Sequence, residues 1–290
     1  MKKPVSKNSE QNPASETTSS MKKDSPWTEG DISIRRGICN VLLIAPHGHP
    51  EDDTNSAKLA RELADQMECY AVINEKFQKP STAGYKKSSL KGHAIDLNNW
   101  REAKRYKKTK AEFIDAIEEF KKAILNSGNP ALLVHVHGIK DENLILVSDK
   151  IDEFKMSPES LQAVIGYGQR KDDNSRFTAS ESDFVAPLIK SLRKHNFNAA
   201  IAPVEPIIVK MNGKDIKKWY CGNHKGRLNQ YFCKPKQKVQ SVQIEFRKKD
   251  VREFETEITE TADVLVASLR PFVQAFLVSA DQKSLNKRPQ

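Results

Sequence analysis

The sequence has no apolar run that approaches the roughly 20 residues needed for a membrane-spanning helix. Residues 1–30 contain almost no apolar side chains, so they lack the hydrophobic centre of a signal peptide and cannot offset the entropy cost of becoming ordered. We therefore expect a disordered polar leader at 1–30 and a disordered basic tail at 281–290. Between them we expect a single folded domain at 31–280, in a protein of the cytoplasm that makes no membrane contact.

Cysteine is also scarce. The four cysteines are far apart in the sequence, so they show neither the close pairs of a zinc knuckle nor a disulfide framework. Free thiols, the usual state in a reducing cytoplasm, are expected for all of them. They are Cys39, Cys69, Cys221 and Cys233.

Aromatic residues make up only 7% of the chain and offer few surfaces on which bases could stack. The net charge of +10 favours an anionic partner, and its basic residues concentrate at 86–110 and 210–249. However, no motif of an RNA-binding domain or a zinc finger accompanies this charge. The basic segments are therefore interpreted either as solvated loops or as segments that attract a small anionic substrate. Nucleic acid is not an expected partner.

The sequence does contain short apolar runs that alternate with helical patterns. These patterns predict strands at 40–45, 69–74, 131–136, 143–147, 198–202 and 239–246. They predict helices at 54–67, 108–125, 157–166, 182–195 and 257–278, and an irregular basic segment at 207–235. Strands that alternate with helices are typical of α/β proteins. We predict one three-layer α/β/α domain around a central mixed, mostly parallel sheet.

Two of the predicted strands end in a His-Gly pair, His47-Gly48 and His137-Gly138. If these strands are neighbours, both imidazoles reach the crevice at the carboxyl ends of the strands, and each glycine would allow a tight turn. A carboxylate from the Glu-Asp-Asp run at 51–53 would complete the two-histidine, one-carboxylate set of a catalytic zinc site. The alternative for each histidine is a strand-end residue that bonds only to backbone.

Water activated by zinc also needs a general base. Glu245 is the candidate, because a carboxylate among the apolar residues of a strand is costly unless it is paired or functional. The alternative is that Glu245 faces solvent on an alternating strand. His135 is expected to pack on the face opposite His137, and His49 is expected to face substrate.

Together these residues resemble the N-formylglutamate amidohydrolase family, whose relatives include phage-type poly-γ-glutamate hydrolases and zinc carboxypeptidases. The motifs that carry the resemblance span nearly the whole predicted domain. In order they are Pro46-His47-Gly48 with acidic residues before a helix, Asp96-Leu97-Asn98, His137-Gly138 and Gln243-Ile244-Glu245. The resemblance implies a zinc-carboxypeptidase-like α/β/α fold.

Carried onto this chain, the resemblance implies a zinc ion held by His47, His137 and an aspartate, with Glu245 as base and proton shuttle. Counting forward from His47 favours Asp52 as the third ligand, whereas counting back from the helix favours Asp53. We prefer Asp53 because it abuts the start of the helix, where it or the next residue is also expected to be the N-cap.

One motif departs from the family pattern. The family's Asp-Leu-Asn-Arg, whose arginine binds a substrate carboxylate, reads Asp96-Leu97-Asn98-Asn99 here. We expect Asn98 to contact the substrate and either Arg101 or Arg227 to replace the missing arginine, because a guanidinium can bind a carboxylate through two hydrogen bonds.

The leading hypothesis is a zinc-dependent hydrolase that cleaves an amide bond in an N-acyl amino acid or a peptide-like substrate bearing a carboxylate. The alternative is a catalytically inactive relative that binds an anion or a partner through its basic loops. The two hypotheses differ in whether turnover accompanies binding, and neither fixes an oligomeric state.

Overall fold

The computed structural model describes residues 25–80, 94–169, 177–211, 213–233 and 238–285, which contain an eight-stranded mixed sheet. In spatial order its strands are β1 (Trp27–Thr28), β2 (Ile32–Arg35), β4 (Tyr70–Asn74), β3 (Val41–Ala45), β5 (Ala131–Gly138), β10 (Val239–Phe246), β6 (Ala163–Gly166) and β7 (Ala199–Ile201). The central strands from β4 to β10 run parallel, and β2 and β6 flank them in antiparallel pairing. The predicted mixed sheet is confirmed.

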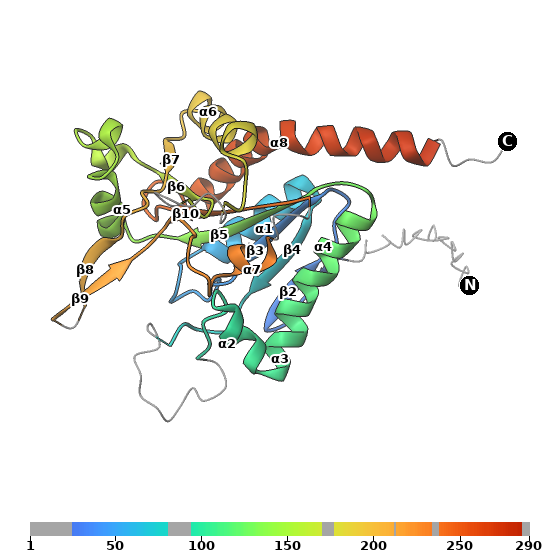
Figure 1. The fold of residues 1–290 in the computed structure, drawn as a ribbon, viewed down its shortest axis with the longest axis horizontal. Coiled ribbons are helices and arrows are strands. Elements are labelled where there is room, and N and C mark those ends of the chain that lie inside the picture. Colours follow the sequence, from blue (N-terminus) through green and yellow to red (C-terminus); the bar gives the residue numbers. More distant parts are fainter. Residues whose placement is uncertain (1–24, 81–93, 170–176, 212, 234–237, 286–290) are drawn as a thin grey trace, which may run out of the picture.

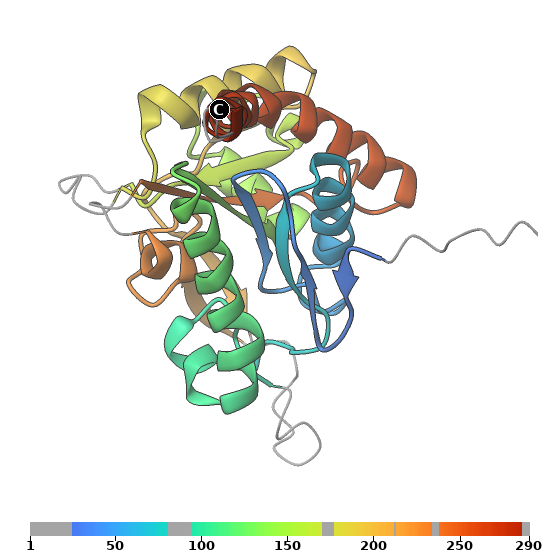
Figure 2. The ribbon, with the colours of Figure 1, turned by 90° about the vertical axis from the view of Figure 1, so that its right-hand side faces the viewer.

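Helices cover both faces of this sheet (Figure 1, Figure 2). One face carries α1 (Ser56–Met67), α6 (Ala186–Lys194), which continues from the turn η5 (Glu181–Val185), and α8 (Glu255–Leu285). The other face carries α2 (Trp100–Arg105), α3 (Lys107–Thr109), η1 (Lys110–Asp115), α4 (Ala116–Asn126) and α7 (Leu228–Phe232). The predicted three-layer α/β/α architecture is confirmed.

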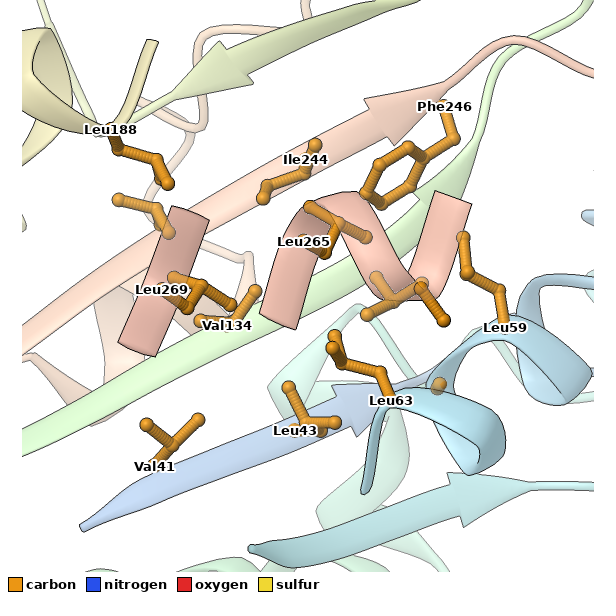
Figure 3. Close-up of a cluster of buried hydrophobic side chains, with 14 of the residues drawn as sticks. Val41, Leu43, Leu59, Leu63, Val134, Leu188, Ile244, Phe246, Leu265 and Leu269 are labelled. Atoms are coloured by element: carbon orange, nitrogen blue, oxygen red, sulfur yellow. The ribbon is translucent and has the colours of Figure 1, made fainter. Parts of the chain in front are cut away.

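The face under α1 and α8 is packed with aliphatic side chains from alternate strand positions, since residues i and i+2 of a strand share a face (Figure 3). All of the following are fully buried there: Val41, Leu43, Val134, Ile244, Leu59, Leu63, Leu188, Leu265 and Leu269. Burying a side chain of this size contributes about 1.5–3 kcal/mol. This packing fixes α1 against β3 and therefore fixes the loop that joins them.

Residues 143–147, predicted as a strand, are helical and belong to α5 (Asp141–Ser148). A short apolar run fits a buried strand and a buried helix equally well. Here the buried residues Leu144 and Val147 lie three positions apart, and Asp141 and Glu142 occupy the first turn, where acidic side chains interact favourably with the helix dipole.

Residues 157–166, predicted as a helix, form the short helical turn η3 (Pro158–Ser160) and the strand β6. A second turn, η2 (Asp152–Phe154), precedes them. β6 is buried throughout and pairs with β10 on one side and β7 on the other. This segment is a strand because β10 and β7 provide backbone hydrogen-bond partners on both of its sides.

Residues 207–235, predicted to be irregular, contain α7 and a hairpin of β8 (Ile207–Met211) and β9 (Lys214–Lys218). The hairpin projects from the body of the fold (Figure 1). β9 reads Lys-Asp-Ile-Lys-Lys and is mostly exposed, so it shows no apolar pattern that could have predicted a strand.

The ends of the ordered elements differ from the predicted boundaries of 31 and 280. β1 lies within the predicted leader, where Trp27 Nε1 donates to Asp65 Oδ1 at 2.8 Å and the Arg61 guanidinium lies 4.2 Å from the Trp27 ring centroid. α8 continues to Leu285, while residues 1–24 and 286–290 lie outside the described residues. Of the helices described, none combines the length and the apolar character needed to cross a bilayer.

Candidate metal centre

Two histidines reach the same edge of the sheet from neighbouring parallel strands. β3 pairs with β5 so that Ile44 lies opposite His135. His47 follows the end of β3 by two residues, and His137 is the penultimate residue of β5. Their rings meet edge to face, with centroids 4.9 Å apart and planes inclined by 71°. The two His-Gly strands are therefore neighbours, which is the condition that the sequence analysis set for a shared site.

Asp53 joins the two histidines in a buried group of three donors. Nδ1 of His47 lies 3.2 Å from Nδ1 of His137, and Oδ2 of Asp53 lies 3.3 Å from the first nitrogen and 3.4 Å from the second. In the part of the chain that the structure describes, these three residues form the one group of His, Cys, Asp and Glu donors close enough together to hold a metal ion. The group is therefore positioned to bind a metal.

The backbone aims the Asp53 carboxylate at the histidines. The amide of Gly138 donates to Oδ2 of Asp53 at 3.0 Å, which ties the loop after β3 to the end of β5. Neither Asp53 nor Thr54 caps α1, contrary to the sequence prediction: the N-cap is Asn55, in a left-handed conformation and without a side-chain cap bond. Since the carboxylate of Asp53 is not used for capping, it can face the histidines.

The two preceding acidic residues bind the segment after β4. Nε2 of Gln78 donates to Glu51 at 2.6 Å, and the amide of Lys79 donates to Oδ2 of Asp52 at 2.7 Å. One carboxylate oxygen of Asp52, the alternative third ligand in the sequence analysis, thereby accepts a hydrogen bond from the Lys79 backbone. The geometry places Asp53 and not Asp52 beside the histidines.

Lys79 itself reaches the donor group, and the sequence analysis assigned it no role. Its Nζ donates to Oδ1 of Asp53 at 2.9 Å and lies 3.5 Å from Nδ1 of His47. Lys79 lies in a polar, basic loop where lysines are numerous, so no local pattern distinguishes it. Its position beside the donor group depends on the hydrogen bonds between its segment and the loop after β3.

The two glycines after the histidines lie where a side chain would not fit. They were expected from the sequence to allow tight turns instead. A Cβ at Gly48 would lie 2.1 Å from the carbonyl oxygen of Asn74, and one at Gly138 would lie 2.3 Å from a guanidinium nitrogen of Arg252. Neither glycine has the positive φ that would require glycine for conformational reasons. The physical constraint is the close approach of neighbouring groups.

Asp96 lies behind His47, a position that the sequence analysis did not assign. Its Oδ1 lies 2.9 Å from Nε2 of His47, and its Oδ2 accepts a hydrogen bond from Arg227 at 2.9 Å. The residue was visible in the Asp96-Leu97-Asn98 motif, but its contact with His47 depends on segments 49 residues apart in the chain. Through Asp96, Arg227 is connected to the candidate metal centre.

The other two predicted substrate-binding residues are arranged differently. Asn98 is buried, and its side-chain oxygen accepts a hydrogen bond from the amide of Leu228 at 3.5 Å. Arg101 is exposed, and its guanidinium lies 5.3 Å from the ring centroid of Trp100. The arginine that the structure connects to His47 is therefore Arg227.

Glu245 lies opposite His137 in the parallel pairing of β10 with β5. It is only 8% exposed, so the alternative of a solvent-facing position on an alternating strand is wrong. Oε1 of Glu245 accepts a hydrogen bond from Nε2 of Gln243 at 3.2 Å. Burial, reinforced by the Asp53 charge, raises the pKa of Glu245 to about 8.

His135 shares the face of His137, contrary to the prediction, because residues two apart on a strand point the same way. It is buried beside the centre, and its Nε2 lies 3.0 Å from the hydroxyl of Ser241. Burial and the neighbouring His137 lower its pKa to about 3. His49 is partly exposed, and its Nδ1 accepts a hydrogen bond from the amide of Glu51 at 3.2 Å.

Burial is the largest influence on the protonation of the three donors. It lowers the pKa of His137 to about 4, so that this ring is neutral at pH 7. For His47, Asp53 and Asp96 outweigh burial and the Lys79 charge, and the pKa is raised. For Asp53, Lys79 and the histidines outweigh burial and hold the pKa well below its usual range. An ionised carboxylate and a neutral imidazole are the forms that bind metals.

Comparison with known proteins identifies related folds at low sequence identity. No protein-family model matches the chain, and a search of curated proteins finds no match. Among solved structures, N-formylglutamate amidohydrolase from Ralstonia eutropha JMP134 is 14% identical, with a TM-score of 0.51 over 84% of this chain and 98% of that chain.

Two further structures show weaker likeness. A gene product of Agrobacterium tumefaciens is 13% identical with a TM-score of 0.49, covering 84% of this chain and 94% of that one. A bacteriophage poly-gamma-glutamate hydrolase is 11% identical with a TM-score of 0.41, covering 84% and 89%. The likeness to the Ralstonia eutropha structure shows that this chain has the fold of an N-formylglutamate amidohydrolase, with a His-Asp-His group positioned to bind a metal ion at the carboxyl edge of its sheet.

Proposed function

We propose that this protein is a zinc-dependent hydrolase that cleaves an amide bond in a small N-acyl amino acid or peptide-like substrate bearing a carboxylate. The buried triangle of His47, His137 and Asp53 carries the proposal. Two atoms bound tetrahedrally to one zinc at about 2.0–2.1 Å lie about 3.3 Å apart. The three sides of the triangle measure 3.2, 3.3 and 3.4 Å, so this donor set fits such an ion.

Zinc, when bound, would polarise the substrate carbonyl and lower the pKa of water to about 7. Glu245 is proposed as the general base, which takes a proton from water and passes it to the leaving nitrogen. Its burial and its position opposite His137 support this role. A pKa of about 8 also supports it, because proton transfer is efficient when the pKa of the base is near the working pH.

Arg227 is proposed to hold the carboxylate of the substrate. One of its nitrogens binds Asp96, and its side chain is 39% exposed, so the guanidinium has further donors to offer an anionic group. Asn98 supports this arrangement by binding the backbone next to Arg227, through the amide of Leu228. Arg101, which stacks near Trp100, is proposed to contact only the outer part of a longer substrate.

The proposal is tested by metal analysis and amidase assays on the purified protein. The substrates are N-formylglutamate, other N-acyl amino acids and γ-glutamyl peptides. His47→Ala is expected to lose both metal and activity, whereas Glu245→Gln keeps the metal and loses activity by about 10²–10⁴-fold. His195→Ala, which removes an exposed histidine at the end of α6 and outside the donor group, serves as the control and should keep both. A protein without stoichiometric metal, together with unchanged activity in His47→Ala, would show that the mechanism is wrong.

A further inference from the structure

Lys79 places an ammonium group directly against two of the candidate ligands. Its Nζ lies 2.9 Å from Oδ1 of Asp53 and 3.5 Å from Nδ1 of His47. Its side chain is 21% exposed, whereas lysine is among the residue types that are usually exposed. A positive charge at this position affects the affinity of these donors for a metal ion.

The position of Lys79 is fixed by the backbone around it. Asn74, at the end of β4, donates to the carbonyl of Pro46 at 2.9 Å, and the side chain of Gln78 donates to Glu51 at 2.6 Å. The amide of Lys79 donates to Asp52 at 2.7 Å. The three successive acidic residues after His49 thus all bind Gln78 or Lys79, which holds the lysine beside the centre.

The two carboxylate oxygens of Asp53 contact different groups. Oδ2 faces both histidines and the amide of Gly138, whereas Oδ1 faces Lys79. The metal donors and the ammonium therefore share one negative charge. Because a divalent ion also draws on that charge, Lys79 and the metal oppose each other at Asp53.

Two ion pairs adjoin the candidate ligands. Asp53 pairs with Lys79, and Asp96 pairs with Arg227 at 2.9 Å. A divalent ion in the donor group would add two positive charges beside these pairs, which favours an anionic ligand. The flexible four-carbon stem of a lysine allows its ammonium to change partners within such a site.

We propose that Lys79 competes with the metal for Asp53 and, once the metal holds that carboxylate, presents its ammonium to an anionic group of the substrate. This inference rests on the proposed function and adds a second cation to Arg227 for recognition of the substrate. Lys79 would be a specificity-determining residue with a direct effect on metal affinity.

The first test measures zinc affinity by competition with a fluorescent chelator. Lys79→Met is expected to bind zinc about tenfold more tightly than the wild type, because the full charge of Asp53 becomes available to the ion. Lys79→Arg, which keeps the charge, is expected to bind no more tightly than the wild type. Lys76→Met is the matched control: it removes a nearby charge that pairs with Asp31 at 3.0 Å, and zinc affinity should not change.

A folded Lys79→Met variant, verified by circular dichroism and thermal melting, that binds zinc as weakly as the wild type or more weakly would overturn the competition. That result would indicate that the lysine only orients Asp53. Lys79→Gln provides the same comparison if the methionine variant does not fold. A wild-type protein that binds no zinc would contradict the proposed function itself, so the two failures are distinguishable.

The second test measures the binding of glutarate, a dicarboxylate without an amide bond, to the zinc-loaded protein by calorimetry. Lys79→Met is expected to bind glutarate at least about tenfold more weakly than the wild type, and Lys76→Met is expected to bind it equally well. Equal affinity of Lys79→Met and the wild type would overturn the role of Lys79 in substrate recognition.

Discussion

Oδ1 of Asp96 lies 2.9 Å from Nε2 of His47, on the side of the ring away from the nitrogen that faces Asp53 and His137. An ionised carboxylate can only accept a hydrogen bond, so Nε2 carries the proton. When His47 is neutral, its lone pair is on Nδ1, where the other two donors converge. Asp96 therefore selects the tautomer of His47 that can bind a metal.

Replacing Asp96 should weaken the metal centre without removing a ligand. Asp96→Asn leaves the shape of the side chain but no longer dictates which nitrogen of His47 is protonated, and partners of this kind typically change metal affinity by about 10–100-fold. We expect a loss of zinc affinity in this range, measured by chelator competition. Asp115→Asn removes an exposed carboxylate that pairs with Lys110 and should have no effect. Unchanged affinity in Asp96→Asn would exclude the orienting role.

The two arginines that could replace the family's missing arginine should differ in effect. Arg227→Ala is expected to raise KM by about tenfold or more, because its guanidinium adjoins the centre through Asp96 and charge-assisted hydrogen bonds are strong. Arg101→Ala, which removes an exposed side chain near Trp100, is expected to change KM by less than about twofold for a small substrate. Steady-state kinetics on both variants test this, and the opposite ranking would assign the role to Arg101.

A methyl group at Gly48 should destabilise the loop that carries His47. The new Cβ would lie 2.1 Å from the Asn74 carbonyl oxygen and 2.8 Å from Cβ of Ala57, and neither atom is the end of a flexible chain. Overpacking of this kind costs about 1–3 kcal/mol. Denaturant unfolding of Gly48→Ala should show this loss, together with weaker zinc binding. In Gly30→Ala the nearest atom would be 3.4 Å away, so its stability should stay within about 0.5 kcal/mol of the wild type.

The raised pKa of Glu245 predicts how the stability of the metal-free protein depends on pH. Its pKa is about 8 in the folded protein, against an ordinary value of 4.5. Between these values the folded state binds more protons than the unfolded state, so the contribution of Glu245 to stability falls as pH rises from about 4.5 to about 8.

Glu245→Gln removes this dependence. After chelator treatment, the variant should be more stable than the wild type at pH 8, by an amount on the order of a few kcal/mol that shrinks towards pH 5. Unfolding curves at several pH values measure the difference. A difference that does not change with pH would contradict the buried, protonatable state of Glu245.

Much of the fold was predictable because hydrophobic periodicity reports burial directly. The apolar runs of β3 and β5 and the stripe of α1 identified the sheet and one of its covering helices. The errors fell where the pattern was short or polar. α5 and β6 are both short apolar segments, and whether each is helix or strand depended on the partners available. β9 has no apolar pattern, because its partner β8 and not the core stabilises it.

The sequence by itself identified the candidate ligands of the centre, because His-Gly after a buried strand and acidic residues before a helix fix their chemistry locally. The tertiary structure alone decided which of them face one another. Asp53 rather than Asp52 meets the histidines because the Lys79 amide binds Asp52 and the Gly138 amide binds Asp53. Lys79 became part of the centre in the same way, since its position depends on contacts between segments that are distant in the chain.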